Sequence, residues 1–214
     1  MSNKCVIIAK SNFLKGGIGI ELLWNGGRDS VEALLEYCRI KRYPSISTGI
    51  GIATFCQVAS NFIGDGCYVK IDTLANLSYD NSDNGTYIID DYDIVDRLWF
   101  TGNEQCEYPI EEMLIAIDEA QPIAMQIGKY LKAVPIETNA INVGDKIVGL
   151  TAFNEVFEET VVGIGGDHDY YPRKPYVAFY SKDDPASNPN NYLTRCDYRK
   201  VTAREEKIRN DSQD

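Results

Sequence analysis

The chain is poor in histidine, the residue on which most acid–base and metal centres depend. Its 214 residues contain one histidine, His168, so a polyhistidine metal centre is excluded. A Ser-His-Asp or Cys-His centre would have to use that side chain, yet no Gly-x-Ser-x-Gly motif occurs. Asp167 and Asp169 flank His168 in a glycine-containing segment. We interpret this segment as a solvated loop rather than as a catalytic site.

Paired cysteines are also missing. No two of the six cysteines are spaced as Cys-x-x-Cys and none lies beside the histidine, which excludes a zinc ribbon and a thioredoxin-like site. Most of them lie among apolar residues, which predicts small buried side chains in a reducing compartment. They are Cys5, Cys38, Cys56, Cys67, Cys106 and Cys196.

Long apolar runs are absent too. No stretch approaches the roughly 18 apolar residues that a membrane span requires. The first apolar stretch, residues 5–9, is too short for a signal peptide and is typical of a β-strand. We therefore expect a cytoplasmic protein that has no membrane association.

Positive charge is in deficit. Acidic residues outnumber Lys and Arg by 32 to 21, which gives a net charge of -11. Direct binding to nucleic acid needs a basic footprint, so we expect none. An acidic surface favours solubility, or docking onto a basic surface of a partner protein.

The apolar pattern predicts an α+β fold for residues 1–133, with an antiparallel sheet carrying two or three helices. Asp29 is the expected N-cap of the first long helix, with Glu32 completing a capping box. Asn84-Gly85 predicts a tight hairpin between two strands. The expected strands are 5–9, 18–24, 67–77, 86–89 and 94–100. The expected helices are 29–42, 52–63 and 110–119, the last broken at Pro122 and resuming as a short helix over 123–131.

A second domain is predicted from residue 134. Short strand patterns separated by polar turns run through residues 134–203 and favour a small SH3-like β-barrel. The charged segment 204–214 is predicted to be a flexible tail.

The junction Trp24–Ser30 carries the sharpest candidate site. Two glycines and an arginine at a helix start are the parts of a backbone anion site, and the same residues also build an ordinary strand-to-helix turn. The nucleotide-binding patterns Gly-x-Gly-x-x-Gly and Gly-Lys-Ser/Thr are missing, and Asp29 would repel an anion. The candidate ligand-binding residues are Asn25, Gly26, Gly27, Arg28 and Ser30.

A weaker pattern suggests a cation site. Asp80, Ser82, Asn84 and Asp91 fall at positions of a calcium-loop pattern, although the last position is Asp rather than Glu and the flanks are typical of strands. A hairpin turn with acidic neighbours explains the same residues more simply. The acidic run Asp90, Asp91 and Asp93 leaves open a metal-dependent hydrolase.

Six short strings of the first part of the chain are distinctive: residues 24–38, 55–58, 61–62, 83–87, 100–102 and 117–122. Through them the chain resembles an uncharacterised family of small hypothetical proteins from Gram-positive bacteria and their phages. The resemblance covers about residues 5–122 and implies a phage or mobile-element setting, with no known activity and no site residues.

Together these features predict a non-enzymatic binding protein of phage or mobile-element origin. We expect it to inhibit a host protein, such as one of anti-phage defence, by occupying its surface. Fourteen tyrosines suit such contacts, because an aromatic ring adds contact area at low entropic cost. The alternatives are a small-molecule binder that sequesters a phosphate-bearing nucleotide at Asn25–Ser30, and the metal-dependent hydrolase. No cofactor is expected, and self-association into a homo-oligomer is left open.

Overall fold

A computed structural model of the chain contains two compact units, Met1–Gln126 and Ile127–Asp214, which we describe separately. It describes residues 3–64, 68–81, 83–102, 104, 106, 108–132, 134–135, 142, 144–150, 156–165, 176–179 and 197–200. The predicted boundary between residues 133 and 134 stays a prediction. The predicted tail, 204–214, and His168 lie outside the described residues.

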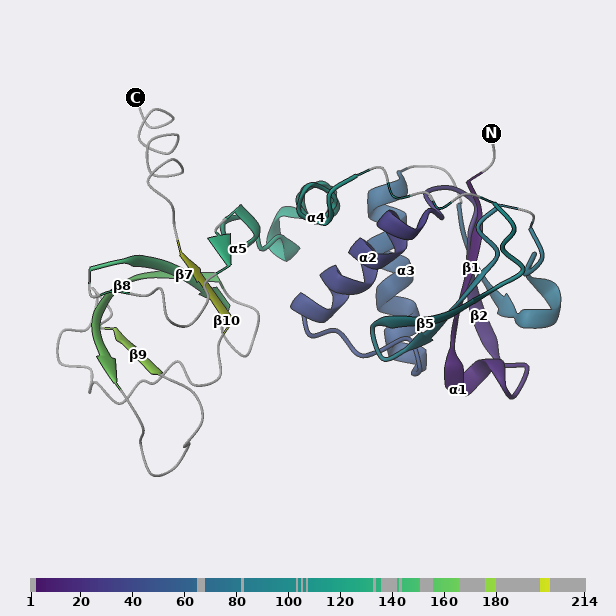
Figure 1. Cartoon of the computed structure of the whole chain (residues 1–214), viewed down its shortest axis with the longest axis horizontal. Coiled ribbons are helices and arrows are strands. Elements are labelled where there is room, and N and C mark those ends of the chain that lie inside the picture. The colour runs from purple at the N-terminus through teal and green to yellow at the C-terminus, as the bar shows by residue number, and fades with distance from the viewer. Residues whose placement is uncertain are drawn as a thin grey trace. The chain divides into compact units, whose positions relative to one another are not determined.

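The first unit is built on a mixed five-stranded sheet in the order β3-β2-β1-β4-β5 (Figure 1). The central strand β1 is buried along its whole length, as its apolar sequence requires. Its neighbours are antiparallel β2 and parallel β4. The strands are β1 (Cys5–Ala9), β2 (Ile18–Leu22), β3 (Val69–Thr73), β4 (Thr86–Asp90) and β5 (Asp93–Leu98).

Two long helices lie on one side of this sheet, and a third packs on them (Figure 1). The apolar stripe predicted for the first long helix, including Val31, Leu34, Leu35 and Cys38, is buried. Leu77 is buried on the other side of the sheet, near Gly19. The helices of the unit are α1 (Lys10–Phe13), α2 (Arg28–Ile40), α3 (Gly49–Ile63), η1 (Leu74–Asn76), α4 (Ile110–Glu119) and η2 (Ile123–Met125).

The α+β class is confirmed, but the expectation of a purely antiparallel sheet is wrong. β1 and β4 pair in parallel, with Val6 opposite Thr86 and Ala9 opposite Ile89. The predicted hairpin at Asn84-Gly85 is also wrong. The strands before and after this turn, β3 and β4, are not neighbours, because β2 and β1 lie between them in the sheet. Gly85 does adopt a positive φ of 67°, but there a Cβ would lie 2.2 Å from the carbonyl oxygen of Leu98. A glycine is required at position 85 because two backbone segments pass close to each other there, and not because of a two-residue turn.

The start of α2 also differs from the prediction. The N-cap is Gly27, and Asp29 lies inside the first helical turn. By contrast, α4 covers the predicted residues 110–119, and Thr48 caps α3 by accepting the Gly51 N–H at 3.0 Å. The predicted helix over residues 123–131 is divided into η2 and a short α5 (Lys129–Lys132).

The second unit contains a sheet in the order β6-β10-β7-β8-β9. All its pairings are antiparallel, and Ile147, Val148 and Leu150 on β7 are buried. Within the residues that the structure describes, this sheet does not close into a barrel. Its strands are β6 (Val134–Pro135), β7 (Lys146–Leu150), β8 (Val156–Gly165), β9 (Tyr176–Phe179) and β10 (Asp197–Lys200).

Most of the described cysteines of the first unit are buried, as predicted. Cys5, Cys38 and Cys56 are buried free thiols, whereas Cys106 is exposed. Burial raises the pKa of Cys38 and of Cys56 to about 12, so both stay protonated and inert at neutral pH. Cys67 and Cys196 lie outside the described residues.

The described helices include none with the length and apolar character needed to cross a bilayer.

Candidate functional site

The junction Trp24–Ser30 connects β2 to α2, and close packing fixes its backbone. A Cβ on Gly26 would lie 2.6 Å from the backbone nitrogen of Cys5, so no larger residue fits there. Gly26 donates its N–H to the carbonyl of Asn3 at 2.9 Å, and its own carbonyl accepts the hydroxyl of Tyr87 at 3.3 Å. Asn25 adopts a left-handed φ of 52°. Packing against β1 therefore accounts for Asn25 and Gly26.

The first turn of α2 already faces a carboxylate of its own chain. The backbone N–H of Ser30 donates to Asp29 Oδ1 at 2.7 Å, and the Ser30 hydroxyl lies 3.4 Å from the same oxygen. Asp29 Oδ2 accepts the backbone N–H of Tyr108 at 3.4 Å. An external anion at Ser30 would have to displace this carboxylate and would be repelled by its charge.

Arg28 is held between two further carboxylates. Its Nε donates to Glu32 Oε1 at 2.6 Å, and its Nη1 lies 3.9 Å from Glu104 Oε2. The hydrogen bond to Glu32 raises the pKa of Arg28. A phosphate would have to compete with both carboxylates for the guanidinium. The anion-binding role of Asn25, Gly26, Gly27, Arg28 and Ser30 stays a prediction.

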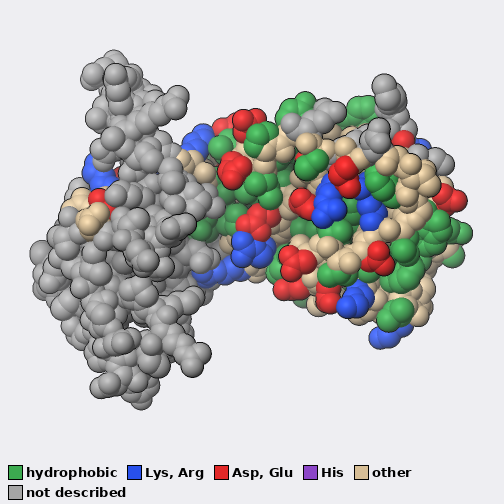
Figure 2. Space-filling view, viewed as in Figure 1, with side chains coloured by type: hydrophobic (Ala, Val, Ile, Leu, Met, Phe, Trp, Pro, Cys, Tyr) green, Lys and Arg blue, Asp and Glu red, His purple; other side chains and the backbone are tan. Residues whose placement is uncertain are grey.

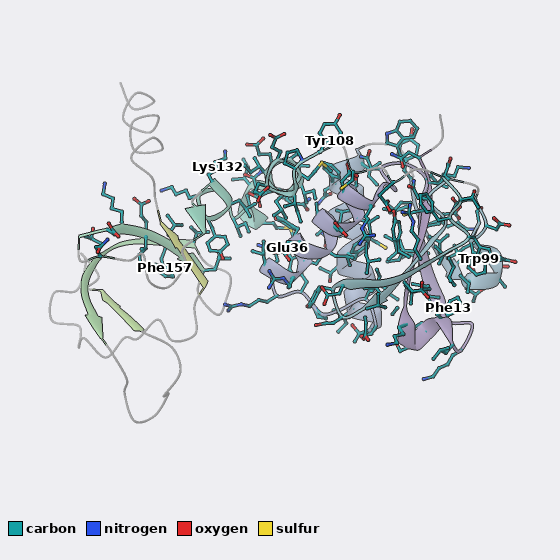
Figure 3. The ribbon with its side chains drawn as sticks, viewed as in Figure 1. Phe13, Glu36, Trp99, Tyr108, Lys132 and Phe157 are labelled. Carbon is teal, nitrogen blue, oxygen red and sulfur yellow. The ribbon has the colours of Figure 1, made fainter. Side chains whose placement is uncertain are left out.

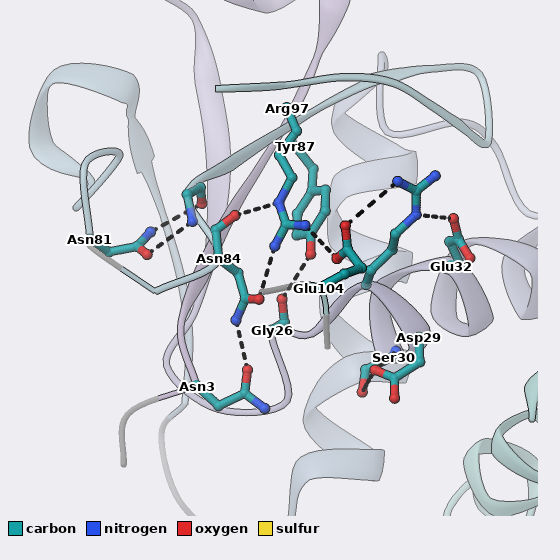
Figure 4. A network of polar contacts seen from close by, with 12 residues as sticks. Asn3, Gly26, Asp29, Ser30, Glu32, Asn81, Asn84, Tyr87, Arg97 and Glu104 are labelled. Carbon is teal, nitrogen blue, oxygen red and sulfur yellow. Dashed lines mark hydrogen bonds and ion pairs between the residues drawn. The ribbon is translucent and has the colours of Figure 1, made fainter. Parts of the chain in front are cut away.

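Glu104 links Arg28 to a second arginine, Arg97, which the sequence analysis did not single out (Figure 4). Arg97 Nη1 lies 2.5 Å from Glu104 Oε1, and its Nε and Nη2 donate to the backbone and side-chain oxygens of Asn84. The Arg97 guanidinium also lies 4.4 Å from the ring centre of Tyr87 and 3.5 Å from that of Phe100. Only 10% of the Arg97 side chain is exposed. This group holds β4, β5 and the α2 junction together.

Of the residues predicted to bind a cation, Asn84 is engaged in other contacts. Asn84 is 1% exposed, and its side chain bonds Arg97 and the amide oxygen of Asn3. Asp91 lies at the β4–β5 turn with φ of 57°. Ser82 lies outside the described residues. In the part of the chain that the structure describes, no group of three or more Asp, Glu, His or Cys side chains is placed to hold a metal ion. The metal role of Asp80, Ser82, Asn84 and Asp91 stays a prediction.

A buried polar group between α2, α3 and α4 is a further candidate, because buried charges often mark functional sites. The hydroxyl of Tyr37 donates to Asp118 Oδ1 at 2.8 Å, and Asp118 is 2% exposed. Lys41 Nζ donates to the carbonyl of Met125 at 2.7 Å, and burial lowers the pKa of this lysine. Gln121 donates to the carbonyls of Val58 and Ile117. These bonds join the three helices, and this structural role is sufficient to explain the buried polar group.

The feature that the sequence analysis missed is an aromatic cluster formed by Phe13, Tyr79 and Trp99. Phe13 and Trp99 lie on the side of the sheet opposite to α2 (Figure 3). The ring centres of Tyr79 and Trp99 are 4.9 Å apart, and those of Phe13 and Trp99 are 6.5 Å apart. Trp99 is 40% exposed and Tyr79 is 38% exposed. The three residues are far apart in sequence, so only the high tyrosine count could have hinted at this surface.

The backbone at Trp99, in the centre of this cluster, has an unfavourable conformation. Trp99 has φ of 55°, a conformation that costs free energy for a bulky side chain. Strain of this kind persists where the surrounding structure imposes it, often at binding sites.

Acidic residues lie along the β4–β5 hairpin that leads to Trp99. They include Asp93 and Asp96 on β5, and Asp90, which lies 3.2 Å from Lys10 Nζ. The space-filling view shows apolar side chains reaching the surface of this unit among acidic and basic ones (Figure 2). Exposed aromatic rings on a unit that also carries exposed acidic residues suit a basic, partly apolar partner.

Compared with protein-family models, with curated proteins and with solved structures, the chain shows no match. The family resemblance noted above stays a prediction.

Proposed function

We propose that the protein is a non-enzymatic binding protein whose first unit docks on a host protein through the cluster of Phe13, Tyr79 and Trp99. By covering that surface, it inhibits the host protein. The observation that carries this proposal is the exposure of two contacting aromatic rings, Tyr79 and Trp99, at 38% and 40%. Tryptophan and tyrosine dominate the binding energy of protein interfaces, because each buries a large area at low entropic cost.

Two further observations support this proposal. The chain carries a net charge of -11, and the hairpin next to Trp99 is acidic, so a basic partner surface is complementary. The charged groups around Glu104 and around Asp118 form bonds within the chain, which is typical of groups that stabilise the fold. As part of the same proposal, we place this interaction in the cytoplasm of the host cell, the setting that the predicted phage or mobile-element origin implies.

The test is retention of host proteins from lysate by the tagged full-length chain and two tryptophan variants. Trp99→Ala removes the centre of the cluster, and Trp24→Ala removes a tryptophan that is 48% exposed elsewhere in the same unit. We expect a specific host protein to be retained by the wild type and by Trp24→Ala, and to be lost with Trp99→Ala. Loss of at least tenfold in affinity is typical of such a position, and raised salt should weaken the complex further.

Two results would contradict the proposal: no protein retained specifically by the wild type, or equal retention by Trp99→Ala. Circular dichroism of both variants establishes that each is folded. A purified partner, once captured, is then assayed for its own activity with and without the protein.

For residues 134–203 we propose the small SH3-like barrel predicted from the strand pattern. The consecutive antiparallel pairing of β7, β8 and β9, with β10 returning beside β7, supports it. Long-range NMR contacts that join the two outer strands would establish closure, and their absence would exclude it.

A further inference from the structure

The outer strand β3 has an unpaired edge in the described sheet, and the hydrogen-bonding pattern shows which groups it presents. Leu23 donates to the carbonyl of Tyr68 at 2.8 Å, and Leu74 donates to the carbonyl of Gly17 at 3.1 Å. In an antiparallel ladder such bonded positions alternate, so Lys70 and Asp72 also turn their backbone groups toward β2. The backbone groups of Val69, Ile71 and Thr73 therefore point away from β2.

The sequence of β3 is self-complementary when it is paired with itself. With Ile71 on a twofold axis, an antiparallel pair places Lys70 opposite Asp72 of the second copy and Val69 opposite its Thr73. Shifting the axis by one residue would place two lysines or two aspartates directly opposite each other, which is unfavourable. The register centred on Ile71 avoids both and uses the backbone groups that point outward.

The helix next to this edge has no charge that would oppose such a contact. α3 contacts β3, and its fifteen residues include no Asp, Glu, Lys or Arg, although a quarter of the whole chain is charged. Its exposed positions include Ile50 at 71%, while Ile71 on the strand is 49% exposed. A second copy with a net charge of -11 thus meets an uncharged flank here instead of like charges.

One end of the edge is already partly occupied. Asp72 Oδ1 accepts the backbone N–H of Thr73 at 2.7 Å and the amide of Asn76 at 2.9 Å. The N–H of Thr73 is therefore engaged, whereas the carbonyl of Thr73 and both groups of Ile71 suit a second strand. This leaves a short pairing segment and points to a reversible dimer rather than an obligate one.

We infer that two copies of the chain associate through their β3 edges, with Ile71 at the twofold axis and the α3 flank beside it, so that the sheet continues across both copies. This contact lies apart from the aromatic cluster, and the inference does not rest on the proposed function.

The test is sedimentation of the full-length chain from about 1 µM to about 1 mM, the span of moderate to weak dissociation constants. We expect concentration-dependent dimer formation by the wild type. Ile71→Lys, which places two positive charges at the axis, should weaken it about tenfold or more. The matched control is Val95→Lys on the opposite edge strand β5, where Val95 is 48% exposed against 49% for Ile71.

A mixing experiment tests the register itself. Asp72→Lys and Lys70→Glu each place like charges opposite each other in the homodimer, but the two variants are complementary to one another. We expect each alone to dimerise more weakly than the wild type and the mixture to form a heterodimer. Circular dichroism establishes whether both variants are folded. If Lys70→Glu does not fold, the comparison of Ile71→Lys with Val95→Lys tests the contact instead.

A wild type that stays monomeric throughout would overturn the inference, as would Val95→Lys weakening the dimer as much as Ile71→Lys. Retention of a host protein by Ile71→Lys should be unchanged, which separates this contact from the proposed function.

Discussion

Arg28 and Arg97 both contact Glu104, yet their surroundings differ. Arg28 is 41% exposed and forms ion pairs with the side chains of Glu32 and Glu104. Arg97 is 10% exposed, donates to Asn84 and lies between two aromatic rings. Water can replace the bonds of Arg28 if they are lost, whereas it has little access to those of Arg97.

We therefore expect Arg97→Ala to lower the free energy of unfolding by about 3 kcal/mol or more, because it leaves buried acceptors unpaired. Arg28→Ala should cost less than about 1 kcal/mol, as exposed ion pairs do. Urea unfolding followed by tryptophan fluorescence measures both. Equal losses would contradict the structural distinction between the two arginines.

Binding assays separate the structural role of Arg28 from the predicted anion site. The small-molecule alternative predicts that Arg28→Ala weakens binding of a phosphate-bearing nucleotide by about 1.5–3 kcal/mol. Calorimetry with a panel of linear and cyclic nucleotides would show it. No heat with any of them would remove that alternative.

Buried thiols should make the fold sensitive to alkaline pH. Burial raises the pKa of Cys38 and Cys56 from 9.0 to about 12, so above pH 9 the unfolded chain binds fewer protons than the folded one. Their contribution to stability is complete below pH 9 and is lost as the pH rises toward 12, at up to about 1.4 kcal/mol per pH unit for each thiol.

Urea midpoints under reducing conditions, at about pH 8 and about pH 10.5, measure this slope. Cys56→Ala should be less stable than the wild type at the lower pH but should lose less stability on going to the higher one. The same slope in both proteins would show that the Cys56 thiol does not contribute.

At the scale of elements, two glycines of α3 show that tertiary contacts, and not the local sequence, determine whether a side chain is tolerated. Gly49 begins the helix in open space, whereas a Cβ on Gly51 would lie 1.9 Å from the carbonyl oxygen of Ser45. The two residues are both in the first turn and look equivalent in the sequence.

We expect Gly49→Ala to stabilise the protein by about 0.5 kcal/mol, because it lowers the entropy of the unfolded chain. Gly51→Ala should destabilise it by several times that amount, since the backbone of Pro44–Ser45 has to move. Thermal unfolding of the two variants gives the signs directly. A loss of stability in Gly49→Ala would indicate a contact at the helix start that this structure lacks.

The elements themselves were largely predictable, and their pairing was not. Apolar periodicity predicted the helix 110–119 to the residue and the strand 5–9. The parallel pairing of β1 with β4 was missed, because the intervening residues 10–85 contain the helices and a further strand pair. Strand periodicity indicates which face is buried, but it carries no information on which strand lies alongside.

At the scale of the whole molecule, both tryptophans, Trp24 and Trp99, belong to the first unit, so their fluorescence reports on that unit alone. In the second unit, Gly149 lies beneath the ring of Phe157, where a Cβ would approach the ring to 2.1 Å. An alanine there would force the ring away from the strand pair β7–β8.

We expect Gly149→Ala to lower the transition temperature detected by far-ultraviolet circular dichroism for the second unit, and to leave the fluorescence transition unchanged. The physical reason is that each unit has its own buried residues, so that loss of packing in one does not remove contacts in the other. A parallel shift of both transitions would show instead that the two units unfold together.

By itself the sequence determined the α+β class, the apolar stripes of the helices, the burial of Cys5, Cys38 and Cys56, and the deficit of positive charge. These properties follow from residue type and spacing along the chain, which are local. Only the tertiary structure decided that Asp29, Glu32 and Glu104 surround the donors at Arg28 and Ser30. It also brought together Phe13, Tyr79 and Trp99, and it put β3 at an edge. Such contacts join residues distant along the chain, so their free energy depends on which elements become neighbours, and no local pattern encodes that choice.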